Sequence, residues 1–399
     1  MLKQSQPPTQ PSTTVSGGVH SVTAALRGVA TAHGIINPVT KTPYTEAMLL
    51  GLGGGLGAGY ILWEFKAREF ANIVLGFRYR WNYPAENLAR LAARLGAVVA
   101  VQEFTSANAA LTALQNADWP VIAWVDKAHM PYHYLPESLK GYISHVLVVR
   151  EVIGDQVIVD DLASEPFSVP ADIFAAGRAR IDSDKKRLIQ VGKGKTIDLP
   201  IAIKDAINEC IEHLGGDSES FNLPAWKKWA KLLTHPKDKK GWPTVFREHI
   251  GLYSTLRSVF EGICLDDTEG QALRSMYADF LDEAADTIKL PALHEAAARF
   301  REVGKHWVQV AEQALPDEIA PFKATKALLR ERYAAYRRHD LAALATINPQ
   351  LEQQQALYDH DFPMNAADVP VLFERLSAAL MTVYDAESAA LKQLKAAMA

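Results

Sequence analysis

This chain has few cysteines, no long uninterrupted apolar run and no excess of basic residues. Among its 399 residues are two cysteines, Cys210 and Cys264, which lie far apart in helix-like sequence. Two distant cysteines exclude a disulfide framework and are typical of a reducing cytoplasm. The longest apolar stretch, residues 47–63, is interrupted by glycines, and a membrane span needs about 20 apolar residues. We therefore expect a cytoplasmic protein that does not cross a membrane.

The charge balance excludes further classes of partner. Lys and Arg number 42 and Asp and Glu number 46, so the formal net charge is −4. Nothing in this balance attracts nucleic acid or an anionic membrane surface. The first residues are polar, rich in Pro, Ser and Thr, and lack the apolar stretch of a signal peptide. We expect a disordered tail over residues 1–17.

The length predicts two domains, and the sequence changes character near residue 195. We place an α+β domain at 18–195 and an all-helical domain at 196–399. A helix is expected over 21–33, ended by Gly34, and a second helix is expected to begin at Thr42. Further helices are expected at 85–95 and 106–116. The β-rich runs are 73–79, 98–104, 121–126, 145–152 and 156–160, and the last two are joined by a hairpin turn at 153–155.

The second half reads as a bundle of amphipathic helices without a fixed repeat period. Prolines separate several of the helical segments. The expected helices are 199–214, 224–234, 243–263, 267–288, 291–314, 318–337, 340–357 and 368–397.

Three residues of the first half have the chemistry of a nucleophile, a base and an orienting acid. Ser21 begins the first predicted helix, where free amides and the helix dipole favour negative charge. His145 begins one strand and Asp161 follows its hairpin partner, so the hairpin brings an imidazole and a carboxylate together. Plain alternatives stay open: Ser21 as a helix cap, His145 as a surface residue and Asp161 as a turn residue.

Two neighbours are candidates for supporting roles. Asp160 is the fallback orienter, although strand alternation points it to the opposite face from Asp161. His20 is expected to help the backbone N–H of Ser21 hold an oxyanion. The most useful single observation is whether the Ser21 hydroxyl lies within hydrogen-bonding distance of the His145 ring.

The glycine-rich run at 51–59 does not predict a nucleotide site. It follows a helix rather than a strand, and no Gly-Lys-Ser/Thr sequence is present. Close backbone packing or room for a substrate is the better interpretation. On the second of these we expect Gly53, Gly54, Gly55 and Tyr60 to contact substrate.

Two other patterns carry weaker hypotheses. One candidate set of metal ligands is Asp126, His129 and His133. Pro131 breaks the helix that would align the two histidines, so we predict no metal site. The segment 226–242 carries three tryptophans and six lysines. It is interpreted as a solvated helix face over buried tryptophans, with a docking patch for an acidic partner as the alternative.

Several segments together resemble a known family. Residues around 17–34, 45–60 and 157–181, with the strand led by His145, resemble the N-terminal domain of butirosin biosynthesis protein H. Residues 273–285 and 300–315 resemble the helical domain of unknown function that follows it in that family. The His-Ser helix start and the D-x-A-x-E-P-F run at Asp161 are the more specific features.

The resemblance implies a papain-like fold and an acyltransferase. Such an enzyme takes an acyl or aminoacyl group from the phosphopantetheine thioester of an acyl carrier protein and passes it to a small amine acceptor. By position it implies Ser21 as nucleophile, His145 as base and Asp161 as orienter, with no cofactor bound to this chain. Papain-like enzymes carry a Gln six residues before the nucleophile, and that position is Val15 here.

Position 21 departs from the family, in which it is Cys. A thiol ionises readily beside a histidine and a helix N-terminus, whereas a hydroxyl depends wholly on the base. Three interpretations stay open: a Cys-to-Ser replacement that stops turnover, a working serine enzyme, or an inactive relative that only binds. A hydrolase with the same triad is a further alternative. The acyl group, the acceptor and self-association into a homo-oligomer are not determined by the sequence.

Overall fold

The computed structural model describes residues 15–65, 70–136 and 139–399. The first fourteen residues of the predicted tail lie outside these ranges. Its last three residues are placed against the protein, and the carbonyl oxygen of Gly17 accepts a hydrogen bond from Arg27 at 2.8 Å. No described helix is long and apolar enough to cross a bilayer.

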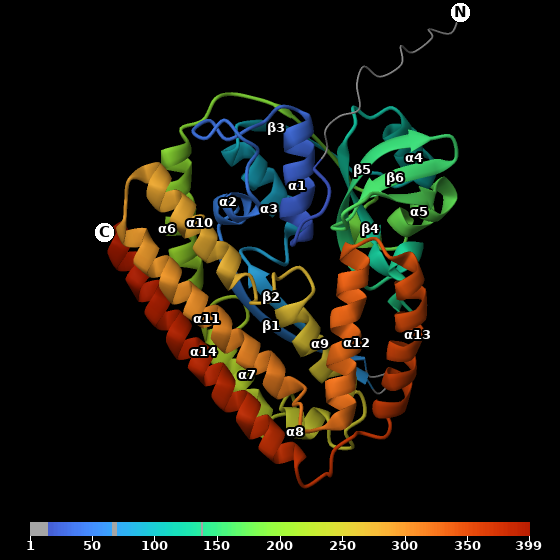
Figure 1. Ribbon diagram of the computed structural model, residues 1–399, viewed down its shortest axis with the longest axis vertical. Coiled ribbons are helices and arrows are strands. Elements are labelled where there is room, and N and C mark those ends of the chain that lie inside the picture. Colours follow the sequence, from blue (N-terminus) through green and yellow to red (C-terminus); the bar gives the residue numbers. More distant parts are fainter. Residues whose placement is uncertain (1–14, 66–69, 137–138) are drawn as a thin grey trace, which may run out of the picture.

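The first half contains a six-stranded antiparallel sheet, as the α+β prediction requires (Figure 1). The strands follow the order β3-β8-β4-β5-β6-β7. Four of the strands were predicted, whereas β7 and β8 were not. Their bounds are β3 Ala97–Gln102, β4 Val121–Asp126, β5 Ser144–Ile153, β6 Gln156–Asp160, β7 Phe167–Pro170 and β8 Leu188–Lys193.

Strands β5 and β6 form the predicted hairpin, and its register places the candidate site. Gly154 adopts a left-handed φ of 61° in the turn, a conformation that glycine adopts without steric cost. Asp160 is paired with Val148. Asp161 is the next residue along the chain, so it lies near the beginning of β5, where His145 is found.

Helix α1 (Ser21–Ala32) packs against this sheet through an apolar face that includes Val22, Leu26 and Val29. All three side chains are buried. Gly34 follows the helix with a φ of 67°, as predicted. Three further helices accompany the sheet: α3 Pro84–Arg94, α4 Ala107–Gln115 and α5 Ala171–Ala179.

The secondary structure around the glycine-rich run at 51–59 differs from the prediction. The second helix begins later than expected: it is α2 (Glu46–Leu52), capped by Thr45, whose hydroxyl accepts a hydrogen bond from the Met48 amide at 2.9 Å. The run then continues into an unpredicted strand, β1 (Leu56–Phe65). It pairs with β2 (Phe70–Arg78) in a separate two-stranded sheet.

The second half is helical, with most predicted bounds confirmed within two residues. Two segments differ. The expected helix 243–263 is divided at Gly251, which has a φ of 71°, and the expected helix 267–288 begins only at Arg274. The helices are α6 Leu199–Leu214, α7 Pro224–Thr234, α8 Trp242–Val245, α9 Leu252–Cys264, α10 Arg274–Ile288, α11 Ala292–Ala314, α12 Ala320–Arg337, α13 Leu341–Tyr358 and α14 Val369–Met398.

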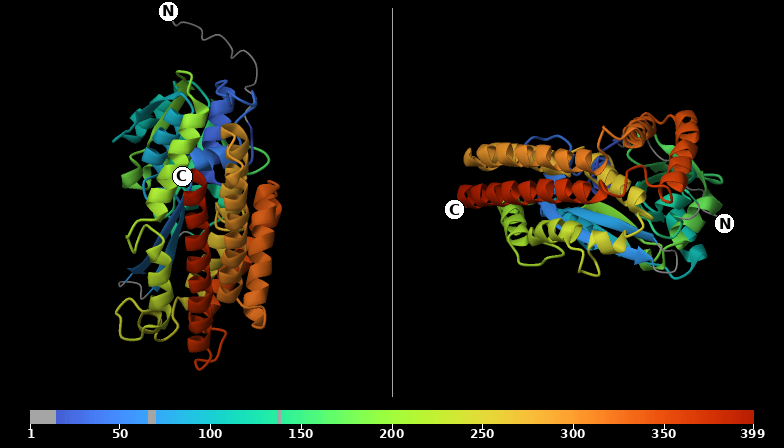
Figure 2. Two further views of the ribbon diagram at one scale, coloured as in Figure 1. Left: turned by 90° about the vertical axis from the view of Figure 1, so that its left-hand side faces the viewer. Right: turned by 90° about the horizontal axis from the view of Figure 1, so that it is seen from below.

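The two halves share a hydrophobic core. The β1–β2 hairpin lies among the helices of the second half, and α6, α7 and α9 contact it (Figures 1 and 2). Gly51 of α2 lies so close to the ring of Phe280 that a Cβ there would be 2.1 Å from it. The buried guanidinium of Arg274 donates to the carbonyl oxygens of Gly57 and Phe77.

Candidate active site

Ser21 is the first residue of α1, and its side chain is buried. The N-cap is His20, whose Nδ1 accepts the Thr23 amide at 3.3 Å. Burial, with a smaller contribution from the positive charge of Arg78, lowers the pKa of His20 to about 4, so the ring is neutral at pH 7. His20 therefore acts as a cap.

Glu46 of α2 holds the beginning of α1 from the other side. Its carboxylate accepts the backbone N–H groups of Val19, at 3.1 Å, and His20, at 3.2 Å. It also accepts the Thr23 hydroxyl and forms an ion pair with Arg27 at 3.3 Å. A carboxylate at a helix N-terminus is favoured by the helix dipole. Glu46 thus fixes the turn from which Ser21 projects.

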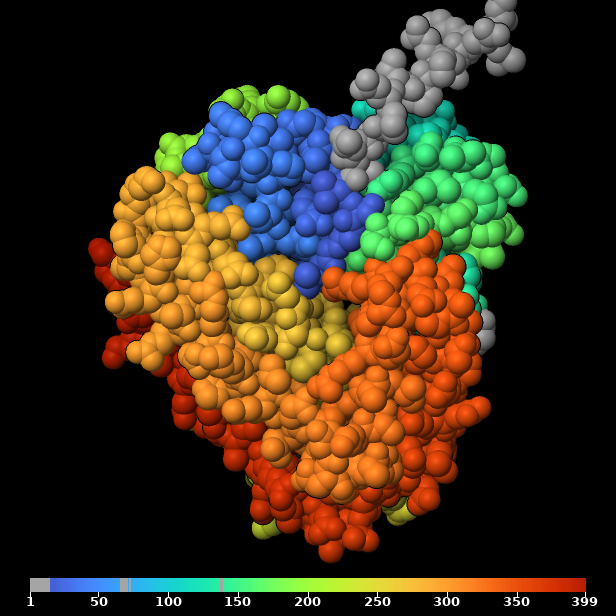
Figure 3. All heavy atoms as spheres, in the orientation of Figure 1, coloured from blue at the N-terminus to red at the C-terminus, as the bar shows by residue number. Residues whose placement is uncertain are grey.

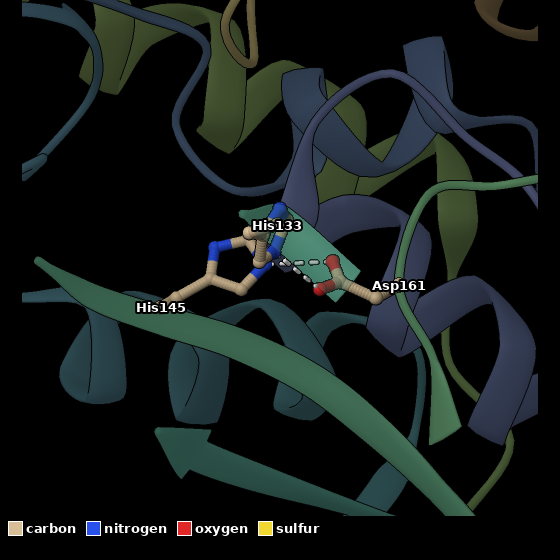
Figure 4. Close-up of side chains that lie close together, drawn as sticks. All are labelled: His133, His145 and Asp161. Carbon is tan, nitrogen blue, oxygen red and sulfur yellow. Dashed lines mark hydrogen bonds and ion pairs between the residues drawn. The ribbon is translucent and has the colours of Figure 1, made fainter. Parts of the chain in front are cut away.

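Asp161 is the centre of a buried hydrogen-bond network (Figure 4). One carboxylate oxygen lies 2.6 Å from Nε2 of His145. The other lies 3.0 Å from Nε2 of His133 and accepts the Tyr132 hydroxyl at 2.8 Å. The Asp161 carbonyl accepts the hydroxyl of Tyr336, which comes from α12. The structure therefore brings together the predicted pair of His145 and Asp161.

The charge state of this network follows from burial and hydrogen bonding. Burial would raise the pKa of Asp161, but His145 and His133 hold that pKa well below its ordinary value. Burial lowers the pKa of His133 to about 4. With an ionised carboxylate as acceptor, each Nε2 carries the hydrogen. The Nδ1 atom of His145 then has the free lone pair that a general base needs.

The hydroxyl of Ser21 has an unexpected partner. It donates to the carboxylate of Asp267 at 2.7 Å, and the Ser21 amide donates to the other oxygen of that carboxylate at 3.0 Å. Asp267 lies in the segment between α9 and α10. In the described part of the chain the hydroxyl is hydrogen-bonded to this carboxylate rather than to His145, so the expected Ser21–His145 hydrogen bond is not formed.

Each partner of this contact lines a cavity. The first is lined by Ser21 and Asp161, together with Val15 and Gly17 from the segment before α1. The second is lined by Asp267, Lys127, Asp266, His133, Arg332 and Tyr336. Leu162 lines both cavities. Ser21 thus lines one cavity, together with Asp160 and Asp161, and its partner Asp267 lines the other, which is rich in charged side chains.

Two family models match the chain in succession. The first, described as "Butirosin biosynthesis protein H, N-terminal", matches residues 20–162. The second, "Domain of unknown function (DUF4872)", matches residues 177–332. This domain order is that of the butirosin biosynthesis protein H-like family. The resemblance predicted from the sequence is confirmed. A comparison with curated proteins finds no match.

The butirosin H-like N-terminal domain spans the three predicted catalytic residues, and Asp267 lies in the second domain. Asp160 stands apart from the network of Asp161. It forms an ion pair with Arg150 of β5 and lines the first cavity. The supporting role assigned to Asp160 stays a prediction.

The residues predicted to contact substrate are occupied with packing. A Cβ on Gly54 would lie 2.5 Å from the ring of Tyr79, and one on Gly55 would lie 2.5 Å from the ring of Tyr277. The Gly53 carbonyl accepts a side-chain hydrogen bond from Asn87 at 2.8 Å. The Tyr60 hydroxyl accepts Nε1 of Trp242 at 2.9 Å, and its ring stacks on Trp229. Neither cavity beside Ser21 and Asp267 is lined by these four residues.

The network of Asp161 also contains the one group in the described ranges with the composition of a metal site. The ligand atoms of His133, His145 and Asp161 lie within 4.8 Å of one another. The Asp161 carboxylate is already hydrogen-bonded to His145 at 2.6 Å and to His133 at 3.0 Å. It also accepts the Tyr132 hydroxyl. A metal with bonds of about 2.0–2.2 Å would have to break all of these hydrogen bonds. The geometry favours an orienting network over a metal site.

The basic segment 226–242 lies away from the candidate site. Trp226, Trp229 and Trp242 are fully buried, as the solvated-face interpretation requires. Helices α7 and α8, which carry the segment, lie at the opposite end of the molecule from α1 (Figure 1). The docking alternative would therefore place a partner far from Ser21.

Sequence reasoning missed the roles of His133, Tyr132, Glu46 and Asp267. His133 had a signal, since it was considered as a metal ligand, but nothing in the sequence connected it with Asp161. Asp267 is separated from Ser21 by 246 positions and comes from the other half of the chain. Only the packing of the two halves brings it to Ser21.

Proposed function

We propose that this protein moves an acyl or aminoacyl group from the phosphopantetheine thioester of an acyl carrier protein to a small amine. The transfer would proceed through an ester on Ser21, in the biosynthesis of an antibiotic or a related specialised metabolite. The observation that carries the proposal is the hydrogen bond from His145 Nε2 to Asp161, which leaves Nδ1 as a base. The family match supports the metabolic setting.

A papain-like arrangement is part of this proposal. Helix α1 presents the nucleophile at its N-terminus and packs on an antiparallel sheet. The sheet supplies the histidine at the beginning of β5 and the acid immediately after β6. This is the relation between nucleophile helix and base-bearing sheet that the resemblance implies.

Each step follows from the chemistry of these groups. His145 Nδ1 takes the proton of Ser21 as Oγ attacks the thioester carbonyl, and the C–S bond breaks as the thiol leaves with that proton. The amine then attacks the ester and gives a proton to His145, the C–O bond breaks as the amide forms, and His145 passes that proton to the Ser21 oxygen. The Ser21 amide at the helix N-terminus stabilises the oxyanion in both steps.

Intact-protein mass spectrometry tests the proposal with a panel of acyl and aminoacyl pantetheine thioesters. We expect an acyl adduct on the natural protein and on Ser21→Cys, and none on Ser21→Ala. Added primary amine should discharge the adduct as an amide. Discharge to free acid at a rate unchanged by amine would make the protein a hydrolase. Lack of any adduct on folded natural protein and folded Ser21→Cys would refute acyl transfer.

A second candidate is a relative that binds a carrier protein without catalysis. The observation in its favour is that Ser21 is bonded to a carboxylate instead of an imidazole. Calorimetry with an acyl carrier protein distinguishes it. Binding together with the absence of adducts on both the natural protein and Ser21→Cys would support this candidate.

A further inference from the structure

Acyl transfer requires both the hydroxyl and the backbone amide of Ser21, and Asp267 accepts a hydrogen bond from each of them. The hydroxyl must give its hydrogen to a base, and the amide must be free to bond the developing oxyanion. Asp267 accepts both hydrogens, one on each carboxylate oxygen. A substrate carbonyl cannot occupy the amide while the carboxylate is there.

The segment that carries Asp267 has an unusual backbone. Asp267, Glu269, Ala272 and Leu273 all have φ between 53° and 65°. Non-glycine residues rarely adopt this left-handed conformation. Four of them within seven residues delay the beginning of α10 to Arg274, and they turn the Asp267 side chain toward the other half of the chain.

Two contacts hold the segment in place. Asp266 forms an ion pair with Lys127 of the first half at 2.8 Å. The buried Thr268 donates its hydroxyl to the Ile263 carbonyl at 3.0 Å. Figure 3 shows the gold surface of α9 and of the segment that follows it between the blue N-terminal part and the orange helices α12 and α13. The segment is thus part of the boundary between the halves.

We propose that Asp267 is a removable block on the Ser21 nucleophile, supplied by the helical half. It occupies the position that an oxyanion would take on the Ser21 amide, and it holds the hydroxyl. Substrate binding must withdraw the carboxylate from Ser21. This inference rests on the proposed function, because a block has meaning only where Ser21 reacts.

Alkylation of a cysteine at position 21 tests the block without any acyl donor. In Ser21→Cys the carboxylate opposes formation of the thiolate and shields the sulfur. Ser21→Cys/Asp267→Gly removes the carboxylate, and glycine accepts the left-handed φ without strain. At pH 7 we expect iodoacetamide to modify Cys at 21 about tenfold faster in the double variant, the effect of one unit of thiol pKa.

The matched control is Ser21→Cys/Glu269→Gly. Glu269 is an exposed acid in the same segment with a φ of 54°, and its carboxylate accepts a hydrogen bond from Ser275. This control should react like Ser21→Cys alone. Burial raises the pKa of Cys210 to about 11 and that of Cys264 to about 12, so peptide mapping will separate their slow modification.

The outcomes are distinct. An increase with Asp267→Gly and none with Glu269→Gly supports the block, even if no thioester ever acylates the protein. An unchanged or lower rate overturns it, because the carboxylate would then be neutral or activating. If Asp267→Gly does not fold, Asp267→Asn replaces it, since Asn tolerates left-handed φ and carries no charge. An increase of at least threefold is then required.

Discussion

Replacing Asp161 with Asn should both destabilise the protein and misalign its base. The carboxylate accepts hydrogen bonds from Tyr132, His133 and His145, and all four side chains are buried. Asn keeps the shape but puts an NH2 group where one of these donors needs an acceptor. A hydrogen bond to a charged acceptor contributes about 1.5–3 kcal/mol, and a donor left buried without a partner costs a further amount.

From these contacts we expect Asp161→Asn to lower the free energy of unfolding by roughly 3–5 kcal/mol, the range for breaking a buried charged network. Tyr132→Phe removes a single donor and should cost about 1–2 kcal/mol. Asp155→Asn, an exposed change in the β5–β6 turn, is the control and should stay within about 0.5 kcal/mol. Urea unfolding at pH 7 measures all three.

The same substitution should slow acylation of Ser21 by about 10³–10⁴-fold, because His145 would hold its hydrogen on the wrong nitrogen. A stability loss for Asp161→Asn no larger than that of Asp155→Asn would refute the network. A loss for Tyr132→Phe equal to that of Asp161→Asn would show that the Tyr132 hydroxyl, not the two histidine hydrogen bonds, carries the stability of this network.

Three further predictions concern stability. Glu387→Ala removes the carboxylate that accepts hydrogen bonds from the buried guanidinium of Arg274. The free energy of unfolding, measured with urea, should fall by about 3–5 kcal/mol, and a fall under about 1 kcal/mol would contradict this. Gly55→Ala combines a φ of 69° with a Cβ 2.5 Å from Tyr277, so thermal unfolding should show a loss of about 2–4 kcal/mol, whereas tolerance would mean that Tyr277 can move. Burial lowers the pKa of His133 to about 4 in the folded protein, so the unfolded chain binds more protons than the folded one between pH 6.5 and 4. The free energy of unfolding should therefore fall by about 3 kcal/mol from this group as the pH is lowered from 7 to 4. Urea unfolding should show a smaller fall for His133→Gln.

The sequence predicted those elements whose boundaries are marked by residues with a local conformational preference. Proline at the first turn located α7, and Gly154 marked the hairpin that brings His145 to Asp161. Both signals act within a few residues. The contact between His145 and Asp161 could therefore be predicted from sequence, because a hairpin is a local structure.

The errors arose where distant packing decides the conformation. Glycines disfavour strands, yet Gly59 and Gly76 pair across β1 and β2 because the indole of Trp81 lies where their Cβ atoms would be. The late beginning of α10 has a similar cause. Besides Gly270, four non-glycine residues before Arg274 adopt left-handed φ, and their residue types gave no indication of it.

The β1–β2 hairpin has a consequence for how this protein can be divided. It belongs to the first half by sequence, but its apolar faces are covered by helices encoded after residue 195. A chain cut at that point would leave the apolar residues of the hairpin exposed on one fragment. The helices that contact it would be exposed on the other fragment. We expect separate expression of the two fragments to yield aggregates, and co-expression to restore a stable pair.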